Sequence, residues 1–285
     1  MPTSLDYLIS AQHEIGGWGY STGHQPVVEP TAVVLLTIRD EPLAKDAFQR
    51  GINWLLQCQH KDGGWGINEN DTESGWQTAW ALIVMKATNQ NPNTITRAGE
   101  WLSTVANYQV SQQEFKKPEV PQHNEIGALI WPWLPGQAGW IEPTALALLA
   151  LAGSVDTLVH TARINSALEY FRYFRTASGG WNVGNATKLD TNILPRAYPT
   201  ALVLMALAGV SQKDILPSDL TALQQDLLCD PGMLAQGAGL LALRVLGNNE
   251  ESVISRLSEN QLSDGSWEHN PFVTAWAVLG LRGYL

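Results

Sequence analysis

The sequence predicts an all-α fold, an (α/α)6 toroid in which six pairs of helices close into a double ring. Three observations predict it: a repeated Gln and Gly-x-Trp spacing, a repeated Thr-Ala step, and a contrast between amphipathic and wholly apolar helices. Self-similarity of this kind is typical of repeat architectures. We expect residues 1–285 to form one domain of six repeats, because repeat folds and barrels commonly reach this size as a single unit.

The first helix of each pair carries an aromatic-aliphatic pair, then Gln, then Gly-x-Trp. The best copy is Trp54-Leu55-x3-Gln59-x3-Gly63-x-Trp65, whose apolar side chains fall on one helical stripe. Such a helix belongs in the outer ring. The frame recurs in other repeats, ending at Trp18, at Trp267 and, with Arg175 in place of Gln, at Trp181. In the third repeat Gly139-Trp140 arrives only after a long insertion, 107–136.

In five of the six pairs the second helix begins with a Thr-Ala step and continues as an apolar run. The five copies start at Thr31, Thr78, Thr144, Thr200 and Thr274. A helix that is apolar all round is covered on every side in a soluble protein, so these helices belong in the inner ring. The fifth unit is degenerate, and apolar periodicity places its helices at 219–229 and 234–247. The last unit ends as apolar as the internal ones, which favours closure over an open solenoid with polar caps.

Composition and charge narrow the classes of partner. The formal net charge is −10 and no basic run exceeds Lys116-Lys117, so we expect no nucleic-acid partner. The first residues do not resemble a signal peptide and no stretch approaches the length that spans a bilayer, so we expect a soluble cytoplasmic protein, with peripheral membrane contact left open. Cys58 and Cys229 lie in different repeats and are predicted to be free, buried thiols.

The repeat pattern resembles that of the squalene and oxidosqualene cyclases, and more loosely that of protein prenyltransferase β-subunits. The resemblance covers nearly the whole chain and implies the toroidal fold. It also implies that the Gln and Trp residues of the pattern tie outer helices together by stacking and hydrogen bonding. These structural residues are Gln12, Gln59 and Gln261 with Trp18, Trp65 and Trp267.

Where those cyclases carry a DxDD motif before the Thr-Ala step, this chain has single acidic residues. The resemblance makes Glu29 and Glu142 the candidate catalytic proton donors, without the neighbouring carboxylates that assist the family's acid. The zinc ligands of the prenyltransferases are replaced by Val273 and Thr200, and no DDxxD cluster is present. We therefore expect no metal and no cofactor.

Aromatic side chains gather where the inner helices begin. These candidate ligand-binding residues are Trp76, Trp80, Trp140, Tyr198, Phe272 and Trp276. They would hold an isoprenoid and stabilise a carbocation through their ring faces, or else fill the core of the toroid. For Glu29 and Glu142 the competing interpretation is that each caps its own helix. A helix N-terminus lowers the pKa of a carboxyl group, and burial raises it.

The leading hypothesis is a terpene-cyclase-like domain that binds an isoprenoid or other apolar ligand in an aromatic-lined lumen, with proton-initiated cyclisation or isomerisation. The alternative is a non-catalytic scaffold that binds a protein partner through the toroid or through the insertion, which could also be a lid carrying Trp131 and Trp133. A glycan-processing enzyme would need two converging carboxylates across the lumen. The content of the lumen separates the three hypotheses. An open apolar lumen would favour the isoprenoid-binding domain, a filled lumen the scaffold, and a pair of converging carboxylates the glycan-processing enzyme.

Overall fold

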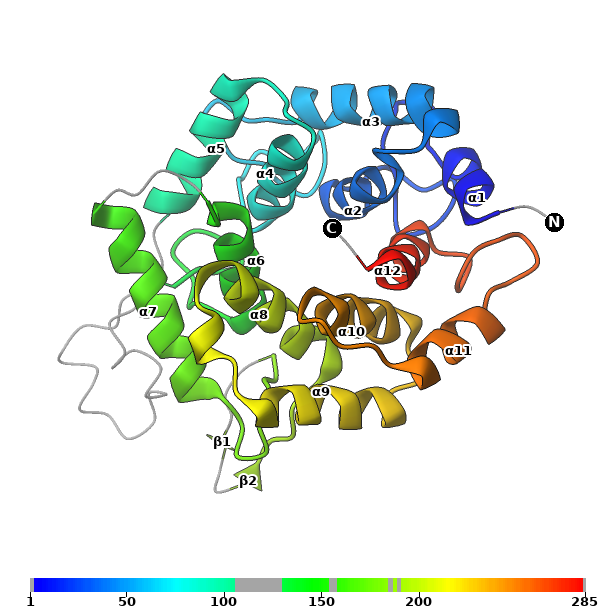
Figure 1. Ribbon diagram of the computed structural model, residues 1–285. Helices are drawn as coiled ribbons and strands as arrows, with labels where there is room; N and C mark the ends of the chain where they lie inside the picture. The colour runs from blue at the N-terminus through cyan, green and yellow to red at the C-terminus, as the bar shows by residue number, and fades with distance from the viewer. Residues whose placement is uncertain (1–2, 106–129, 154–157, 184–186, 189–190, 284–285) are drawn as a thin grey trace.

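The computed structural model describes residues 3–105, 130–153, 158–183, 187–188 and 191–283, which form a double ring of helices (Figure 1). Within these residues the inner ring consists of α2 (Val28–Ile38), α4 (Gln77–Ala87), α6 (Ile141–Leu151), α8 (Ala197–Val210), α10 (Met233–Val245) and α12 (Pro271–Arg282). The outer ring consists of α1 (Ser4–Ser10), α3 (Lys45–Gln57), α5 (Pro92–Thr104), α7 (Leu158–Phe174), α9 (Pro217–Cys229) and α11 (Glu251–Glu259). The predicted α/α toroid is confirmed.

Shorter elements connect the rings. In the described part of the chain, the 3-10 turn Pro42–Ala44 precedes α3 and the 3-10 turn Gln212–Asp214 precedes α9. The strands β1 (Thr187–Lys188) and β2 (Thr191–Asn192) form a short antiparallel pair in the loop before α8. Most of the predicted insertion lies outside the described residues. No helix of the described chain is long and apolar enough to cross a membrane.

Burial separates the two rings as the sequence pattern predicts. All residues of α2 are buried, whereas α3 buries one side only, through residues such as Ile52 and Leu55. Each inner helix packs against the inner helices of the preceding and following repeats, and α12 packs against α2. The hydroxyl of Thr37 in α2 donates a hydrogen bond to the carbonyl of Ala275 in α12 at 3.4 Å. These contacts close the ring.

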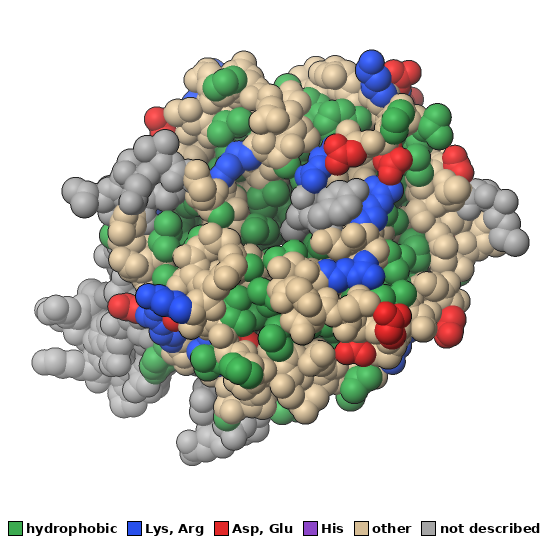
Figure 2. All heavy atoms as spheres, in the orientation of Figure 1, with side chains coloured by type: hydrophobic (Ala, Val, Ile, Leu, Met, Phe, Trp, Pro, Cys, Tyr) green, Lys and Arg blue, Asp and Glu red, His purple; other side chains and the backbone are tan. Residues whose placement is uncertain are grey.

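Basic side chains lie around the centre of the ring at the end that faces the viewer in Figure 2. Near the ends of three inner helices, such side chains bind the carbonyl groups that the next helix leaves unpaired at its own end. Lys86 of α4 donates to Ala152 O at 2.6 Å, and Arg282 of α12 donates to Thr37 O at 2.7 Å. Arg244 of α10 likewise binds the last turn of α12.

The Trp and Thr of each repeat fix the loop between an outer and an inner helix. In the second repeat the backbone N–H of Trp65 donates to Thr78 Oγ1 at 2.9 Å, and its indole N–H donates to Leu55 O at 2.7 Å. The Trp therefore ends one helix while the Thr holds the start of the next. The same pairs of bonds are made by Trp18 with Thr31 and Leu8, by Trp181 with Thr200 and Phe171, and by Trp267 with Thr274 and Leu257.

The third repeat differs from the sequence interpretation. Trp131, not Trp140, is its loop tryptophan: the backbone N–H of Trp131 donates to Thr144 Oγ1 at 3.2 Å and its indole N–H donates to Leu102 O at 2.7 Å. The pair Gly139-Trp140 resembles the motif in sequence but lies at the wrong spacing. The loop Trp stands thirteen residues before the Thr, and this separation runs from Trp131 to Thr144 as it does from Trp18 to Thr31. Trp131 is thus a buried structural residue and no part of a lid.

In the degenerate fifth repeat a glutamine replaces the tryptophan. The side chain of Gln236 is fully buried in α10, and its amide Nε2 donates to Leu227 O at 2.7 Å and to Asp230 O at 2.6 Å. The last turn of α9 therefore keeps a buried donor for its carbonyl groups.

Gln12, Gln59 and Gln261 each link one outer helix to the next. Gln59 Nε2 donates to Gly63 O in its own loop and to Thr94 O in α5, and Arg97 donates to Gln59 Oε1 at 3.3 Å. Gln261 Nε2 binds Ser4 Oγ at 2.8 Å, so the same type of contact joins the last repeat to the first. Gly63 has φ +100°, and a Cβ there would lie 2.6 Å from Arg97 O, which explains the glycine.

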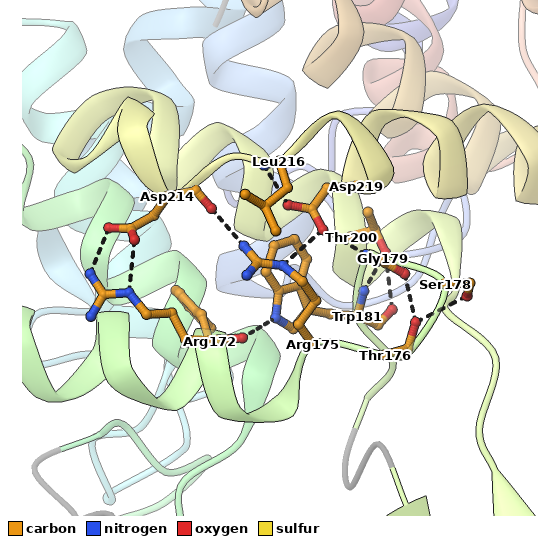
Figure 3. A network of polar contacts seen from close by, with 12 residues as sticks. Arg172, Arg175, Thr176, Ser178, Gly179, Trp181, Thr200, Asp214, Leu216 and Asp219 are labelled. Carbon is orange, nitrogen blue, oxygen red and sulfur yellow. Dashed lines mark hydrogen bonds and ion pairs between the residues drawn. The ribbon is translucent and has the colours of Figure 1, made fainter.

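In the fourth repeat an ion pair replaces the glutamine contact (Figure 3). Arg175 Nε donates to Asp219 Oδ1 at 2.9 Å, and the Asp219 side chain is fully buried. Asp219 also accepts hydrogen bonds from the backbone N–H groups of Gly180 and Leu216, each at 2.9 Å. The guanidinium of Arg175 lies over the ring of Trp181, 4.9 Å from its centroid. The substitution of Arg for Gln is thus matched by a buried acid on the next outer helix.

The thiol of Cys58 is buried, as predicted, but Cys229 is exposed, because it is the last residue of α9 and lies off the side that α9 buries.

A cavity of about 160 Å³ lies at the closure between the first and last repeats, where Leu5 and Leu8 of α1 face Val278 and Arg282 of α12. The helix α1 is shorter than α3, α5 or α9.

Candidate functional site

At the start of five of the six inner helices one residue lies in the same register, two positions before the Thr. These residues are Glu29, Trp76, Glu142, Tyr198 and Phe272. The residue one turn further along, two positions after the Thr, is Trp80 in α4 and Trp276 in α12. Five of the six candidate aromatic residues and both candidate acids therefore occupy two successive levels of the inner ring, at the end where the helix N-termini meet.

Glu29 is 8 % exposed and accepts a hydrogen bond at Oε2 from the hydroxyl of Tyr20. The pKa of Glu29 is raised to about 7, because burial raises it by more than the hydrogen bonds from Tyr20 and the nearby indole of Trp80 lower it. Glu29 lies in the first turn of α2, where the N-cap residue is Val27. Its carboxyl group binds the hydroxyl of a loop tyrosine.

Glu142 occupies the matching position of α6, two repeats away. Burial raises the pKa of Glu142 to about 7 as well, and the charge of Glu142 contributes to the raised pKa of Glu29. Burial raises the pKa of Tyr198 well above its usual range, and the charges of Glu29 and Glu142 add to that rise. The two acids therefore share one electrostatic environment, and the charges of both act on Tyr198. At neutral pH each acid is protonated in a substantial fraction of molecules.

Aromatic rings pack edge to face beside these acids. Trp276 lies 5.8 Å from Trp80, 5.9 Å from Tyr198 and 6.4 Å from Phe272, measured between ring centroids. The ring of Tyr20 packs against Phe272 at 5.6 Å. Because Trp276 and Trp80 come from the two helices that flank α2, and both are fully buried, their indoles occupy the lumen at this level. We call Tyr20, Trp80, Tyr198, Phe272 and Trp276 the aromatic cluster.

The other two predicted aromatic residues have different surroundings. Trp76 packs edge to face against Trp133, at 4.9 Å between centroids. Trp140 is 39 % exposed, and its backbone N–H donates to Trp131 O. The structure thus brings four of the six candidates together. Sequence reasoning missed Tyr20, although its position directly after the Gly-x-Trp loop, facing the same helix end, was a usable signal.

The chain matches a known family over most of its length. A family model described as the squalene-hopene cyclase C-terminal domain matches residues 4–218, about three quarters of the chain. The chain belongs to this family. No curated protein sequence matches it. Membership agrees with the repeated helix pairs of the double ring.

Solved structures of type II terpene cyclases share the fold at low identity. The cyclase MstE from Scytonema, in an arginine variant bound to its substrate geranylgeranyl dihydroxybenzoate, aligns with a TM-score of 0.66 and 16% identity over 98% of this chain and 95% of that one. An aspartate variant of MstE with the product merosterolic acid A gives a TM-score of 0.64 and 18% identity over 98% and 94%. These neighbours extend over almost the same length as this chain.

A second group of similar structures consists of bacterial α2-macroglobulins. The Salmonella protein aligns with a TM-score of 0.53 and 15% identity over 100% of this chain but only 18% of its own. The toroid is therefore also used as one part of much larger proteins.

Proposed function

We propose that this chain is a terpene-cyclase-like enzyme that binds an isoprenoid at the aromatic mouth of the inner ring, and that Glu29 begins the reaction as the proton donor. The observation that carries the proposal is the buried carboxyl group of Glu29, which has a pKa of about 7 and lies beside the aromatic cluster. A general acid works best when its pKa lies near the operating pH, because its protonated form is then populated and still able to release the proton.

The contact with Tyr20 suits this role. The hydroxyl of Tyr20 donates to Oε2 of Glu29, so the transferable proton belongs on Oε1. When that proton leaves, the hydrogen bond stabilises the carboxylate that remains. The nearby indole of Trp80 acts in the same direction, since it too lowers the pKa of Glu29. Both residues therefore strengthen an acid that burial alone would make too weak.

Aromatic rings supply the second requirement of such a reaction. Protonation of an isoprenoid leaves a carbocation, and the face of an aromatic ring stabilises a cation by roughly 0.5 to 2 kcal/mol. Tyr20, Tyr198 and Phe272 lie at the level of Glu29, and Trp276 lies one turn deeper. These rings also exclude water, which would otherwise trap the cation.

The similarity to MstE supports the proposal at the level of the fold. Because the MstE structures match this chain over nearly their whole length, a single toroid of this size is compatible with terpene cyclisation. The substrate bound to the arginine variant of MstE carries a geranylgeranyl group. A ligand of this class is our first choice for this chain.

The test is incubation of the purified protein with squalene, geranylgeraniol and geranylgeranyl diphosphate, followed by mass spectrometry of the products. We expect turnover that Glu29→Gln lowers at least a hundredfold, because general acid catalysis contributes about 10² or more to the rate. Glu259→Gln, at the exposed end of α11, is the matched control and should leave turnover unchanged. Absence of binding and turnover with all three isoprenoids would remove the proposal.

A non-catalytic scaffold is the second candidate, and the filled lumen favours it. Trp80 and Trp276 are fully buried and touch each other, so an apolar ligand has access to the mouth of the ring but not to the depth behind these rings. If the scaffold interpretation holds, isoprenoids leave the thermal stability of the protein unchanged.

The glycan hypothesis requires one ionised and one protonated carboxyl group. It would be supported if the protein hydrolysed nitrophenyl glycosides and if Glu29→Gln or Glu142→Gln abolished that hydrolysis.

A further inference from the structure

Arginines join neighbouring outer helices at five of the six junctions of the outer ring. Between α3 and α5, Arg97 donates to Gln59 Oε1 and also to His60 O and Lys61 O, at 2.6 and 2.9 Å. The corresponding arginines are Arg50 between α1 and α3, Arg163 between α5 and α7, Arg175 between α7 and α9, and Arg256 between α9 and α11. Because hydrogen bonds from a charged donor are stronger than neutral ones, these arginines stabilise the five junctions.

The sixth junction, between α11 and α1, has a threonine at this position. A Cβ at Gly265 would lie 2.5 Å from Thr3 O, just as a Cβ at Gly63 would lie 2.6 Å from Arg97 O. Thr3 therefore takes the place of Arg97. Its short side chain is bound within its own helix, where the hydroxyl donates to Asp6 Oδ2 at 2.7 Å in the capping box of α1. The guanidinium contact of the other junctions is thus missing here.

Packing at the sixth junction is also incomplete. The cavity of about 160 Å³ lies here, lined by Leu5 of α1 and Val278 of α12, and side chains that line a void lack packing contacts on one side. The helix α1 has seven residues, whereas α3 and α5 have thirteen each. Among the described residues, the side-chain hydrogen bond across this junction is the neutral one from Gln261 to Ser4. The closure of the ring is therefore its weakest junction.

We propose that the ring opens at this junction, where α1 detaches from the otherwise folded protein, and that this opening loosens the contact between Tyr20 and Glu29. Elements with few buried contacts open locally at a smaller free energy than the whole protein needs to unfold. The opening of α1 is independent of the proposed function. Only its effect on the proton donor of the reaction rests on that function.

Trp18 connects α1 to the candidate site. Its indole N–H donates to Leu8 O in α1 at 2.7 Å. Tyr20 follows two residues later in the same loop, and its hydroxyl binds Glu29. When α1 detaches, the indole loses its acceptor, while the backbone N–H of Trp18 stays bound to Thr31 of α2. The side chain of Tyr20 therefore gains freedom to leave Glu29 when α1 opens.

Hydrogen exchange of two indole N–H groups in the wild-type protein tests the opening. Trp18 and Trp65 are both fully buried, and each donates at 2.7 Å to a carbonyl of an outer helix, so the closed structure alone predicts similar protection. We expect the indole N–H of Trp18 to exchange about tenfold to hundredfold faster in nitrogen-15 NMR spectra, as the loss of one or two hydrogen bonds at a junction provides. The backbone amides of α1 should exchange together with it.

A pair of serine variants within α1 tests the place of the opening. Ser4→Ala removes the hydrogen bond from Gln261 and should speed the exchange of the Trp18 indole by a further factor of about three to ten. Ser10→Ala, which removes a hydroxyl that binds Tyr7 O within the same helix, is the matched control and should have no such effect. The indole of Trp65 should exchange equally in both variants.

Tyr20→Phe tests the link to the candidate site. Coupling between two equilibria is reciprocal, so if the opening of α1 loosens the contact between Tyr20 and Glu29, loss of that contact promotes the opening by the same factor. We expect Tyr20→Phe to speed the exchange of the Trp18 indole about threefold, as the loss of one hydrogen bond provides. Tyr173→Phe, at a half-exposed side chain of α7, is the control and should leave that exchange unchanged.

Equal exchange of the Trp18 and Trp65 indoles in the wild-type protein would overturn the opening of the ring. Faster exchange of Trp18 that Tyr20→Phe leaves unchanged would overturn its link to Glu29. Neither measurement needs a substrate. If no isoprenoid binds, the proposed function fails, and these exchange rates still decide whether the ring opens at α1.

Discussion

The hydroxyl of Tyr20 donates a hydrogen bond to Oε2 of Glu29, and this contact joins a loop of the first repeat to the first turn of α2. It brings a donor to a buried acid: burial raises the pKa of Glu29, the hydrogen bond from Tyr20 lowers it, and the result is about 7. The acid strength of Glu29 is thus set by two opposing effects, and each can be altered separately.

Tyr20→Phe should raise the pKa of Glu29 above its present value, because the hydrogen bond that favours the carboxylate is lost while burial remains. Carbon-13 NMR titration of the glutamate side chains measures the change. Tyr7→Phe removes a hydroxyl that contacts Thr22 at 3.2 Å elsewhere in the first repeat and serves as the control. An unchanged titration of Glu29 in Tyr20→Phe would show that the contact is absent in solution.

Folding stability should fall as the pH rises from about 4.5 to about 7. In this interval the unfolded chain has lost the proton of Glu29 whereas the folded protein still holds it, so the folded state binds more protons and a rise in pH favours unfolding. The rise in pKa from 4.5 to about 7 corresponds to about 3 kcal/mol for Glu29. Urea unfolding at pH 5 and pH 8 should show a smaller difference for Glu29→Gln than for wild type, and an equal difference would contradict the assignment.

Trp131→Phe should destabilise the protein by about 2 to 3 kcal/mol, since it removes buried ring volume and leaves Leu102 O without its donor. Trp140→Phe, at a side chain that is 39 % exposed, should change stability by less than about 1 kcal/mol. The two midpoints in guanidinium chloride give the comparison. Equal losses would restore Trp140 as the structural tryptophan of the third repeat.

Asp219→Ala should cost about 3 to 5 kcal/mol, because it leaves Arg175 without its acidic partner and two backbone N–H groups without an acceptor. Arg172, paired with Asp214 at 2.7 Å on a side chain that is 46% exposed, supplies the control. Arg172→Ala should cost less than about 1 kcal/mol. Thermal unfolding of both variants measures the contrast, and a small loss for Asp219→Ala would mean that the fourth repeat is held by packing alone.

Several features of this protein follow from the sequence alone. The contrast between one-sided and all-round apolar helices assigns each helix to a ring, because burial of apolar surface is local to the helix that carries it. The Thr of each repeat also fixes a register, so Glu29, Glu142 and most of the candidate aromatic residues could be placed at one end of the inner ring from their spacing. The order of the repeats and the closure of the ring were predictable for the same reason.

Only the tertiary structure decided the chemistry at that end of the ring. The neutral fraction of Glu29, its contact with Tyr20, the meeting of Trp80 and Trp276 across α2, and the choice of Trp131 over Trp140 all depend on neighbours supplied by a loop or by another repeat. A pattern of residues fixes which face of a helix is buried. The pKa of an acid and the partner of an indole N–H depend on what fills the space beyond that face, and that space is shared by helices distant in sequence.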